Sequence, residues 1–170
     1  FGAPVPPEVK ARSLLSIPPS DKPDPAPREA AIYGVFGSAV NVTDGRYSCF
    51  LYPPDLHGGE LFQYTLMPMH LRELFSLAEL EEATLAEATA FTRGVPVLRV
   101  PATPKSPFYN HQGPGVQHDA KTVLFDLWAD PEQLKPLNDP VIEARMRQLA
   151  IAEMRRAGAL KFALKGQPLE

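Results

Sequence analysis

Short segments in which apolar and polar residues alternate recur along the chain, and they predict β-strands. Residues 30–36 form an apolar run that is rich in β-branched and aromatic side chains and typical of a buried strand. Residues 39–43 and 46–52 flank the dipeptide Asp44-Gly45. A dipeptide of this kind between two alternating segments predicts a β-hairpin with a type I′ turn. Because residues 46–52 carry apolar side chains at both alternating sets of positions, we expect this strand to be buried on both faces.

Later segments predict further strands and helices. We expect strands at 61–67 and 122–128, and only an edge or irregular strand at 95–100, because Pro96 cannot donate a ladder hydrogen bond. Two short helices are expected at 69–75 and 77–88, the second of which is dense in good helix formers.

The clearest helix starts at Asp139-Pro140 and runs to Ala157, where Gly158 stops it. A capping side chain followed by proline at the first helical position is typical of a helix start. The apolar residues of this segment lie roughly on one face (Ile142, Met146, Leu149 and Ile151), so we expect the helix to dock on a core.

These elements predict an α+β fold, in which a small antiparallel sheet packs against helices. Residues 1–29 contain eight prolines and are interpreted as a connector, because proline fixes φ and removes a backbone donor. The folded domain is expected to span 30–157, and residues 158–170 form a tail.

Composition narrows the possible partners. The chain has 170 residues, 44% hydrophobic content and a net charge of −3, so it offers no electrostatic reason to bind nucleic acid or an anionic membrane. No apolar run approaches the length of a membrane span. The single cysteine, Cys49, rules out an internal disulfide and slightly favours the cytoplasm; we interpret it as a small buried hydrophobe.

Two regions offer candidate site residues. His70 and Glu73 are three residues apart, which on a helix would place both side chains on one face as metal ligands; the alternative is a polar helix-start residue at a pocket edge. Residues 101–120 form a long proline- and glycine-rich loop of the length that often lines a site. Its candidate substrate-pocket residues are Tyr109, Asn110, His111 and His118, and the alternative is a surface connection.

Four phrases of this chain resemble bacterial sulfatases of the alkaline-phosphatase superfamily. Residues 28–47 resemble the opening of the sulfatase C-terminal subdomain, and residues 124–133 (Leu-Phe-Asp-Leu-Trp-Ala-Asp-Pro-Glu-Gln) are similar to a signature near the end of those enzymes. Residues 63–70 look like the segment that follows the first phrase in one branch of the family. Residues 1–9 with Ser13-Leu14-Leu15 resemble the tail of the catalytic domain, and residues 159–170 have no counterpart.

The resemblance implies the C-terminal part of a sulfuric ester hydrolase, with an antiparallel sheet of about four strands and a terminal helix packed on it. Its expected partner is the sulfatase catalytic domain, which in the complete protein acts on a sulfate-ester small molecule. The family uses a formylglycine made within a Cys/Ser-x-Pro-x-Arg motif and a divalent metal such as Ca²⁺. Cys49 is followed by Phe-Leu-Tyr-Pro and no serine fits the motif either. We therefore expect no catalytic residue, no metal ligand and no activity in this chain alone.

Two alternatives are open at this point. The superfamily also contains phosphodiesterases and phosphonate-ester hydrolases, which share the same frame. A non-catalytic packing or interaction module is the other alternative. The coding sequence upstream of Phe1 discriminates between an enzyme and a module, because the enzyme requires the Cys/Ser-x-Pro-x-Arg motif in frame.

Overall fold

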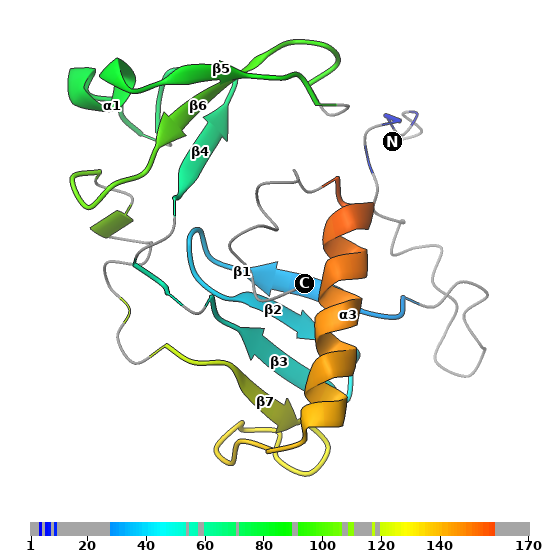
Figure 1. Cartoon of the computed structure of the whole chain (residues 1–170). Helices are drawn as coiled ribbons and strands as arrows, with labels where there is room; N and C mark the ends of the chain where they lie inside the picture. Colours follow the sequence, from blue (N-terminus) through cyan, green and yellow to red (C-terminus); the bar gives the residue numbers. More distant parts are fainter. Residues whose placement is uncertain are drawn as a thin grey trace.

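The computed structural model describes residues 28–53, 55–57, 60–70, 72–89, 92–106, 109–110, 117 and 120–158, together with Pro4, Pro6, Pro7 and Val9. Most of the expected connector at 1–29 and all of the tail after Gly158 lie outside the described residues. The described residues form an α+β structure with two antiparallel sheets and a long C-terminal helix (Figure 1), which confirms the predicted fold class.

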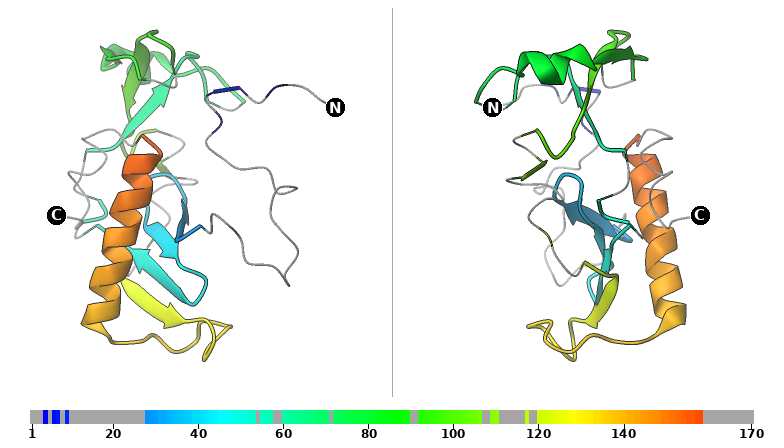
Figure 2. Two further views of the ribbon diagram at one scale, coloured as in Figure 1. Left: turned by 90° about the vertical axis from the view of Figure 1, so that its right-hand side faces the viewer. Right: turned by 60° about the vertical axis from the view of Figure 1, so that its left-hand side comes forward.

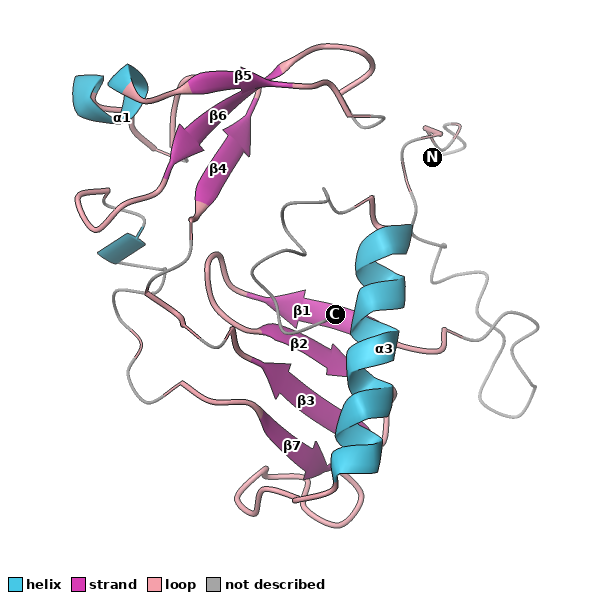
Figure 3. Ribbon diagram, in the orientation of Figure 1, coloured by secondary structure: helices cyan, strands magenta, loops and turns pink. Residues whose placement is uncertain are grey.

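Four strands make up the main sheet. They are β1 (Ala31–Gly34), β2 (Val40–Thr43), β3 (Tyr47–Leu51) and β7 (Val123–Asp126), in the order β1-β2-β3-β7. All neighbouring pairs are antiparallel. Helix α3 (Pro140–Arg156) crosses one face of this sheet (Figure 3). The main sheet and its helix are the arrangement that the sequence predicts.

The hydrophobic core lies between α3 and the main sheet. Val42, Cys49 and Leu51 from the strands are fully buried, and Met146 and Ala150 face them from the helix. At about 25 cal/mol per Å² of apolar surface removed from water, burial of this kind is the main source of stability in such a domain. The prediction that Cys49 is a small buried hydrophobe is therefore confirmed, because its thiol packs in the core as an apolar side chain would.

Helix α3 begins and ends where the sequence predicts, after the capping Asp139 and before Gly158. The Asp139 carboxylate accepts hydrogen bonds from the amides of Val141 and Ile142, both at 3.0 Å. Pro140 occupies the first helical position, where its missing N–H has no helical partner to lose. Gly158 has φ 79°, the left-handed conformation that ends many helices.

The hairpin between β2 and β3 is confirmed, but its expected type I′ turn is wrong. Gly45 has φ 92°, while Asp44 and Arg46 do not have positive φ, so the two consecutive left-handed residues of a type I′ turn are absent. The Asp44 carboxylate instead accepts hydrogen bonds from the amides of Arg46 at 3.0 Å and Tyr47 at 2.7 Å. A side chain thus stabilises this turn, as aspartate often does.

A second sheet, which the sequence reading did not foresee, has the order β4-β6-β5. Its strands are β4 (Phe62–Thr65), β5 (Thr84–Ala86) and β6 (Val97–Pro101). In both views of Figure 2 it lies above the main sheet and α3. The prediction that residues 95–100 form an edge strand is wrong, because β6 lies in the centre. Pro96 immediately precedes the first residue of β6, where it withholds no ladder hydrogen bond.

Both short helices predicted before β6 need correction. The described residues of this segment, 69–70 and 72–75, are not helical: Met69 forms a bridge with Leu74, and the His70 amide donates to the carbonyl of Glu73 at 2.8 Å. The helix expected at 77–88 is confirmed only as α1 (Leu77–Glu81), after which the chain enters β5. Pairing of β5 with β6 outweighs the helix propensity of this segment, which is a weak local preference.

Candidate functional site

Of the candidate pocket residues, the structure describes Tyr109, Asn110 and His70. Tyr109 is buried at 6% exposure, and its hydroxyl lies 3.4 Å from Nδ1 of His57. Asn110 is exposed, and its side-chain amide donates to the carbonyl of Pro104. His111 and His118 lie outside the described residues. The structure therefore brings Tyr109 to His57, a contact that the sequence did not predict, and uses the Asn110 side chain to hold its own loop.

His70 is not paired with Glu73 as a helical metal-ligand pair would be. Its Nε2 lies 3.0 Å from Oε1 of Glu79, and both side chains are less than 10% exposed. The His70 ring also packs edge-on against Phe75 with a centroid separation of 4.3 Å. The helical placement that both interpretations of His70 assume is wrong, because no described residue between β4 and α1 is helical, and the His70 side chain is buried.

Glu79 explains why His70 is buried there. The other Glu79 oxygen, Oε2, accepts hydrogen bonds from the amide and the hydroxyl of Ser76, both at 2.9 Å. Ser76 in turn accepts from the Glu79 amide, which completes a capping box at the start of α1. The Glu79 carboxylate therefore contacts both the start of α1 and the His70 ring, and the His70–Glu79 pair connects the segment before α1 to that helix.

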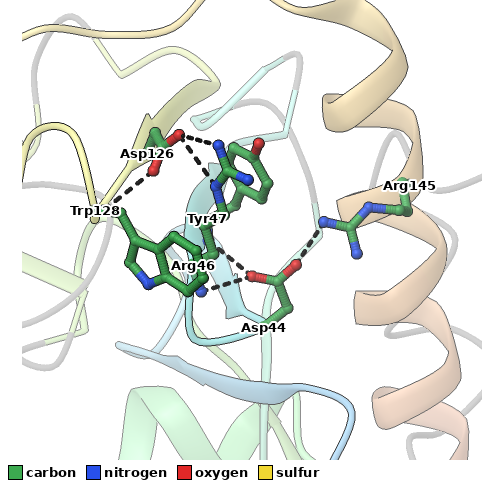
Figure 4. A network of polar contacts seen from close by, with 6 residues as sticks. All are labelled: Asp44, Arg46, Tyr47, Asp126, Trp128 and Arg145. Atoms are coloured by element: carbon green, nitrogen blue, oxygen red, sulfur yellow. Dashed lines mark hydrogen bonds and ion pairs between the residues drawn. The ribbon is translucent and has the colours of Figure 1, made fainter.

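A polar network joins the β2–β3 hairpin, the end of β7 and α3 (Figure 4). Asp126 accepts hydrogen bonds from Nε and Nη2 of Arg46, at 3.2 and 2.9 Å. Arg145 of α3 pairs with the other oxygen of Asp44. The Arg46 guanidinium also lies over the ring of Trp128, 5.1 Å from its centroid. The network therefore ties the hairpin to both a strand and the helix.

The charges of this network shift the pKa values of its carboxyl groups. Burial raises the pKa of Asp44, but the hydrogen bond from the Tyr47 amide and the Arg145 guanidinium outweigh that effect and hold the pKa below its ordinary value. The Arg46 side chain is the largest cause that lowers the pKa of Asp126. Both carboxylates are ionised at neutral pH and each pairs with an arginine, so the network holds the hairpin, β7 and α3 together.

Cys49 has the opposite character to a nucleophile. Burial, followed by the charge of Glu143, raises the pKa of its thiol to about 11. The thiolate is the reactive form of cysteine, and at neutral pH very little of it exists at such a pKa. Together with its full burial, this excludes Cys49 as an attacking group in the folded chain.

The face of the main sheet opposite α3 carries a row of aromatic rings. Phe50 lies between Tyr33 and Phe125, with ring centroids at 6.3 and 6.0 Å and near-perpendicular planes. The Tyr33 hydroxyl shares a hydrogen bond of 2.8 Å with the buried Ser48 hydroxyl, yet Tyr33 is 46% exposed. We call Tyr33, Phe50 and Phe125 the aromatic row. Side chains alternate along a strand, so the row points away from the core beneath α3.

Among the described residues, no group of three or more His, Cys, Asp and Glu side chains comes together as metal ligands would. No helix in the same part of the chain is long and apolar enough to cross a membrane.

Comparison with known proteins finds no match: no family model, no curated protein and no solved structure is similar to this chain.

Proposed function

We propose that this chain is the C-terminal subdomain of a bacterial sulfatase, which supports the catalytic domain of a sulfuric ester hydrolase. The proposal rests first on the two phrases that resemble the family, residues 28–47 and 124–133. They lie far apart in the sequence, yet β3 and β7 are direct neighbours and Tyr47 is in register with Asp126.

The contact between the two phrases is the observation that carries the proposal. Arg46 belongs to the first phrase and Asp126 to the second, 80 residues later, and they form a two-nitrogen ion pair. Their roles are therefore to hold a frame together. A family signature made of such residues supports a shared subdomain frame and does not require any of them to take part in catalysis.

The aromatic row supports the packing role of this subdomain. A sheet that is covered by a helix on one face only presents its other face to solvent or to a partner. Here that face carries three adjacent aromatic rings, of which Tyr33 is 46% exposed, Phe50 is half-buried and Phe125 is buried. We propose that the aromatic row packs against the catalytic domain of the complete enzyme.

The chemistry of the family would belong to that catalytic domain. Formylglycine and a divalent metal such as Ca²⁺ supply the nucleophile and the charge stabilisation in sulfatases. The described residues fit neither group: no cysteine or serine of the chain stands in a Cys/Ser-x-Pro-x-Arg motif, and no metal-ligand group forms among them. This subdomain would contribute a rigid surface on which the catalytic domain packs, and contacts to substrate from the 101–120 loop.

The first test reads the coding sequence upstream of Phe1. The proposal requires an open frame that contains Cys/Ser-x-Pro-x-Arg, and a stop codon or an unrelated domain there would leave only the packing-module alternative. The complete protein should hydrolyse an aryl sulfate ester, whereas the 170-residue chain should not. Faster turnover of a phosphate diester or a phosphonate monoester than of the sulfate ester would instead identify the related hydrolases of the superfamily.

The second test addresses the aromatic row in the complete protein. Phe50→Ser should weaken packing between the domains and lower the melting temperature of the complete protein more than that of the 170-residue chain. Leu134→Ser is the control, because Leu134 is 71% exposed and lies outside both the aromatic row and the polar network of Arg46 and Asp126. Equal losses in the long and short proteins would contradict a docking role for the row.

A further inference from the structure

Arg99 has surroundings unlike those of the other arginines that the structure pairs. It lies in β6, the central strand of the second sheet, and its Cζ is 3.9 Å from the centroid of the Phe62 ring. Its Nε is buried and has no hydrogen-bond acceptor among the described residues. Arg99 also forms no ion pair within that part of the chain. Four other arginines each pair with a carboxylate: Arg46, Arg145, Arg147 and Arg156.

Stacking on Phe62 stabilises the charge of the Arg99 guanidinium but provides no acceptor for its N–H groups. A ring beneath the plane of the group attracts its charge, but the N–H donors point outward within that plane. A cation that is partly removed from water without an anionic partner is costly, and a buried donor without an acceptor adds to that cost. The geometry therefore leaves the Arg99 guanidinium without an anionic partner among the described residues.

Tyr64 lies beside the Arg99 side chain. It is the direct register partner of Arg99, so both side chains lie on the same face of the second sheet as Phe62. The two residues also interact electrically: burial raises the pKa of Tyr64, and the positive charge of Arg99 offsets part of that rise. Two aromatic rings and one cation thus face the same side of two neighbouring strands.

We infer that Arg99, with Phe62 as its stacking platform and Tyr64 beside it, binds the oxyanion group of a small molecule. A planar guanidinium offers two parallel N–H donors, which match the oxygens of a sulfate, sulfonate or carboxylate group. The aromatic rings of Phe62 and Tyr64 suit a ligand with an apolar or aromatic body next to its anionic group. This inference goes beyond the proposed function, because it assigns ligand binding to this chain itself and can fail or hold independently.

The experiment follows the backbone amide resonance of Tyr64, the register partner of Arg99, by NMR in the full 170-residue chain, because every Arg99 variant retains it. Sodium sulfate and phenyl sulfate are titrated separately, with sodium chloride added to keep the ionic strength constant. The resonance should shift and saturate with both probes, and phenyl sulfate should bind more tightly because its ring meets the aromatic walls. Arg99→Met should weaken binding at least about tenfold, since a charge-assisted hydrogen bond is worth a decade or more in affinity.

Arg155→Met is the matched control, because it removes the same charge from the exposed side of α3. It should leave the affinity for both probes unchanged. Arg99→Lys tests geometry in a second way: it keeps the charge, loses the planar fork and should also bind more weakly. Circular dichroism and thermal melts of each variant establish that it is folded.

Three results would overturn the inference. One is a shift that grows linearly without saturation, which would mean general screening. Another is equal weakening in the Arg99 and Arg155 variants. The third is a response in the short chain that disappears in the longest protein the gene encodes, which would assign Arg99 to a carboxylate of the preceding domain instead of a small molecule.

Discussion

Replacing Leu51 by alanine should destabilise the chain by about 2–5 kcal/mol. Leu51 is fully buried in β3 and belongs to the core between the main sheet and α3. The substitution removes three methyl or methylene groups, which at about 0.8 kcal/mol each accounts for roughly 2.4 kcal/mol of transfer free energy. The cavity that the neighbours cannot fill adds to this loss. Because a domain of this size is stable by only about 5–15 kcal/mol, the variant loses a large share of its stability.

Urea unfolding followed by circular dichroism measures this loss, since α3 dominates the helical signal. Leu85→Ala is the matched control: it makes the same chemical change on a strand where the side chain is 73% exposed, and it should shift the unfolding free energy by no more than about 0.5 kcal/mol. Similar losses in the two variants, or a loss below about 1 kcal/mol for Leu51→Ala, would refute the assignment of the core.

Three further predictions follow from the local geometry. The carboxyl groups of Asp44 and Asp126 have pKa values below the ordinary 3.8, so the stability they contribute is present above that pH and is lost as the pH falls below it. The difference between the urea midpoints at about pH 6 and about pH 3 measures this loss of stability. The difference should be smaller in Asp44→Asn, which lacks one of the two carboxyl groups. The thiol of Cys49, with its pKa raised to about 11, should react with a thiol reagent at about pH 8 only when the chain unfolds, and rapid labelling of the native protein would contradict its burial. Gly34→Ala should lower the melting temperature, because the added Cβ would meet the Ala39 carbonyl oxygen at 2.6 Å, and an unchanged temperature would show that the backbone yields there at no cost.

The elements that were predicted correctly are those in which local signals and tertiary packing agree. Helix α3 has its capping aspartate, its proline and its terminal glycine in the sequence, and its apolar stripe meets the sheet. The hairpin between β2 and β3 is likewise marked by Asp44-Gly45. Local consistency of this kind is what makes a segment predictable from sequence alone.

The second sheet was missed because its determining contacts are not local. Residues 84–86 lie in a stretch of good helix formers, and only pairing with β6 makes them a strand. The same limit applied to His70, whose pairing with Glu79 nine residues on depends on a turn that the predicted helix at 69–75 would have excluded. Propensity could not find either contact, because both are decided by segments that meet only in the folded chain.

The residues that resemble a known family and the residues proposed to bind an anion lie in different parts of this chain. Arg46 and Asp126 stand in the two phrases that resemble sulfatases, and they form one ion pair that holds β7 to the β2–β3 hairpin. Arg99 stands in no motif, and its neighbours Phe62 and Tyr64 are 37 and 35 positions away in the sequence. Only the register of β4 against β6 places the three on one face, so no spacing rule could have indicated them.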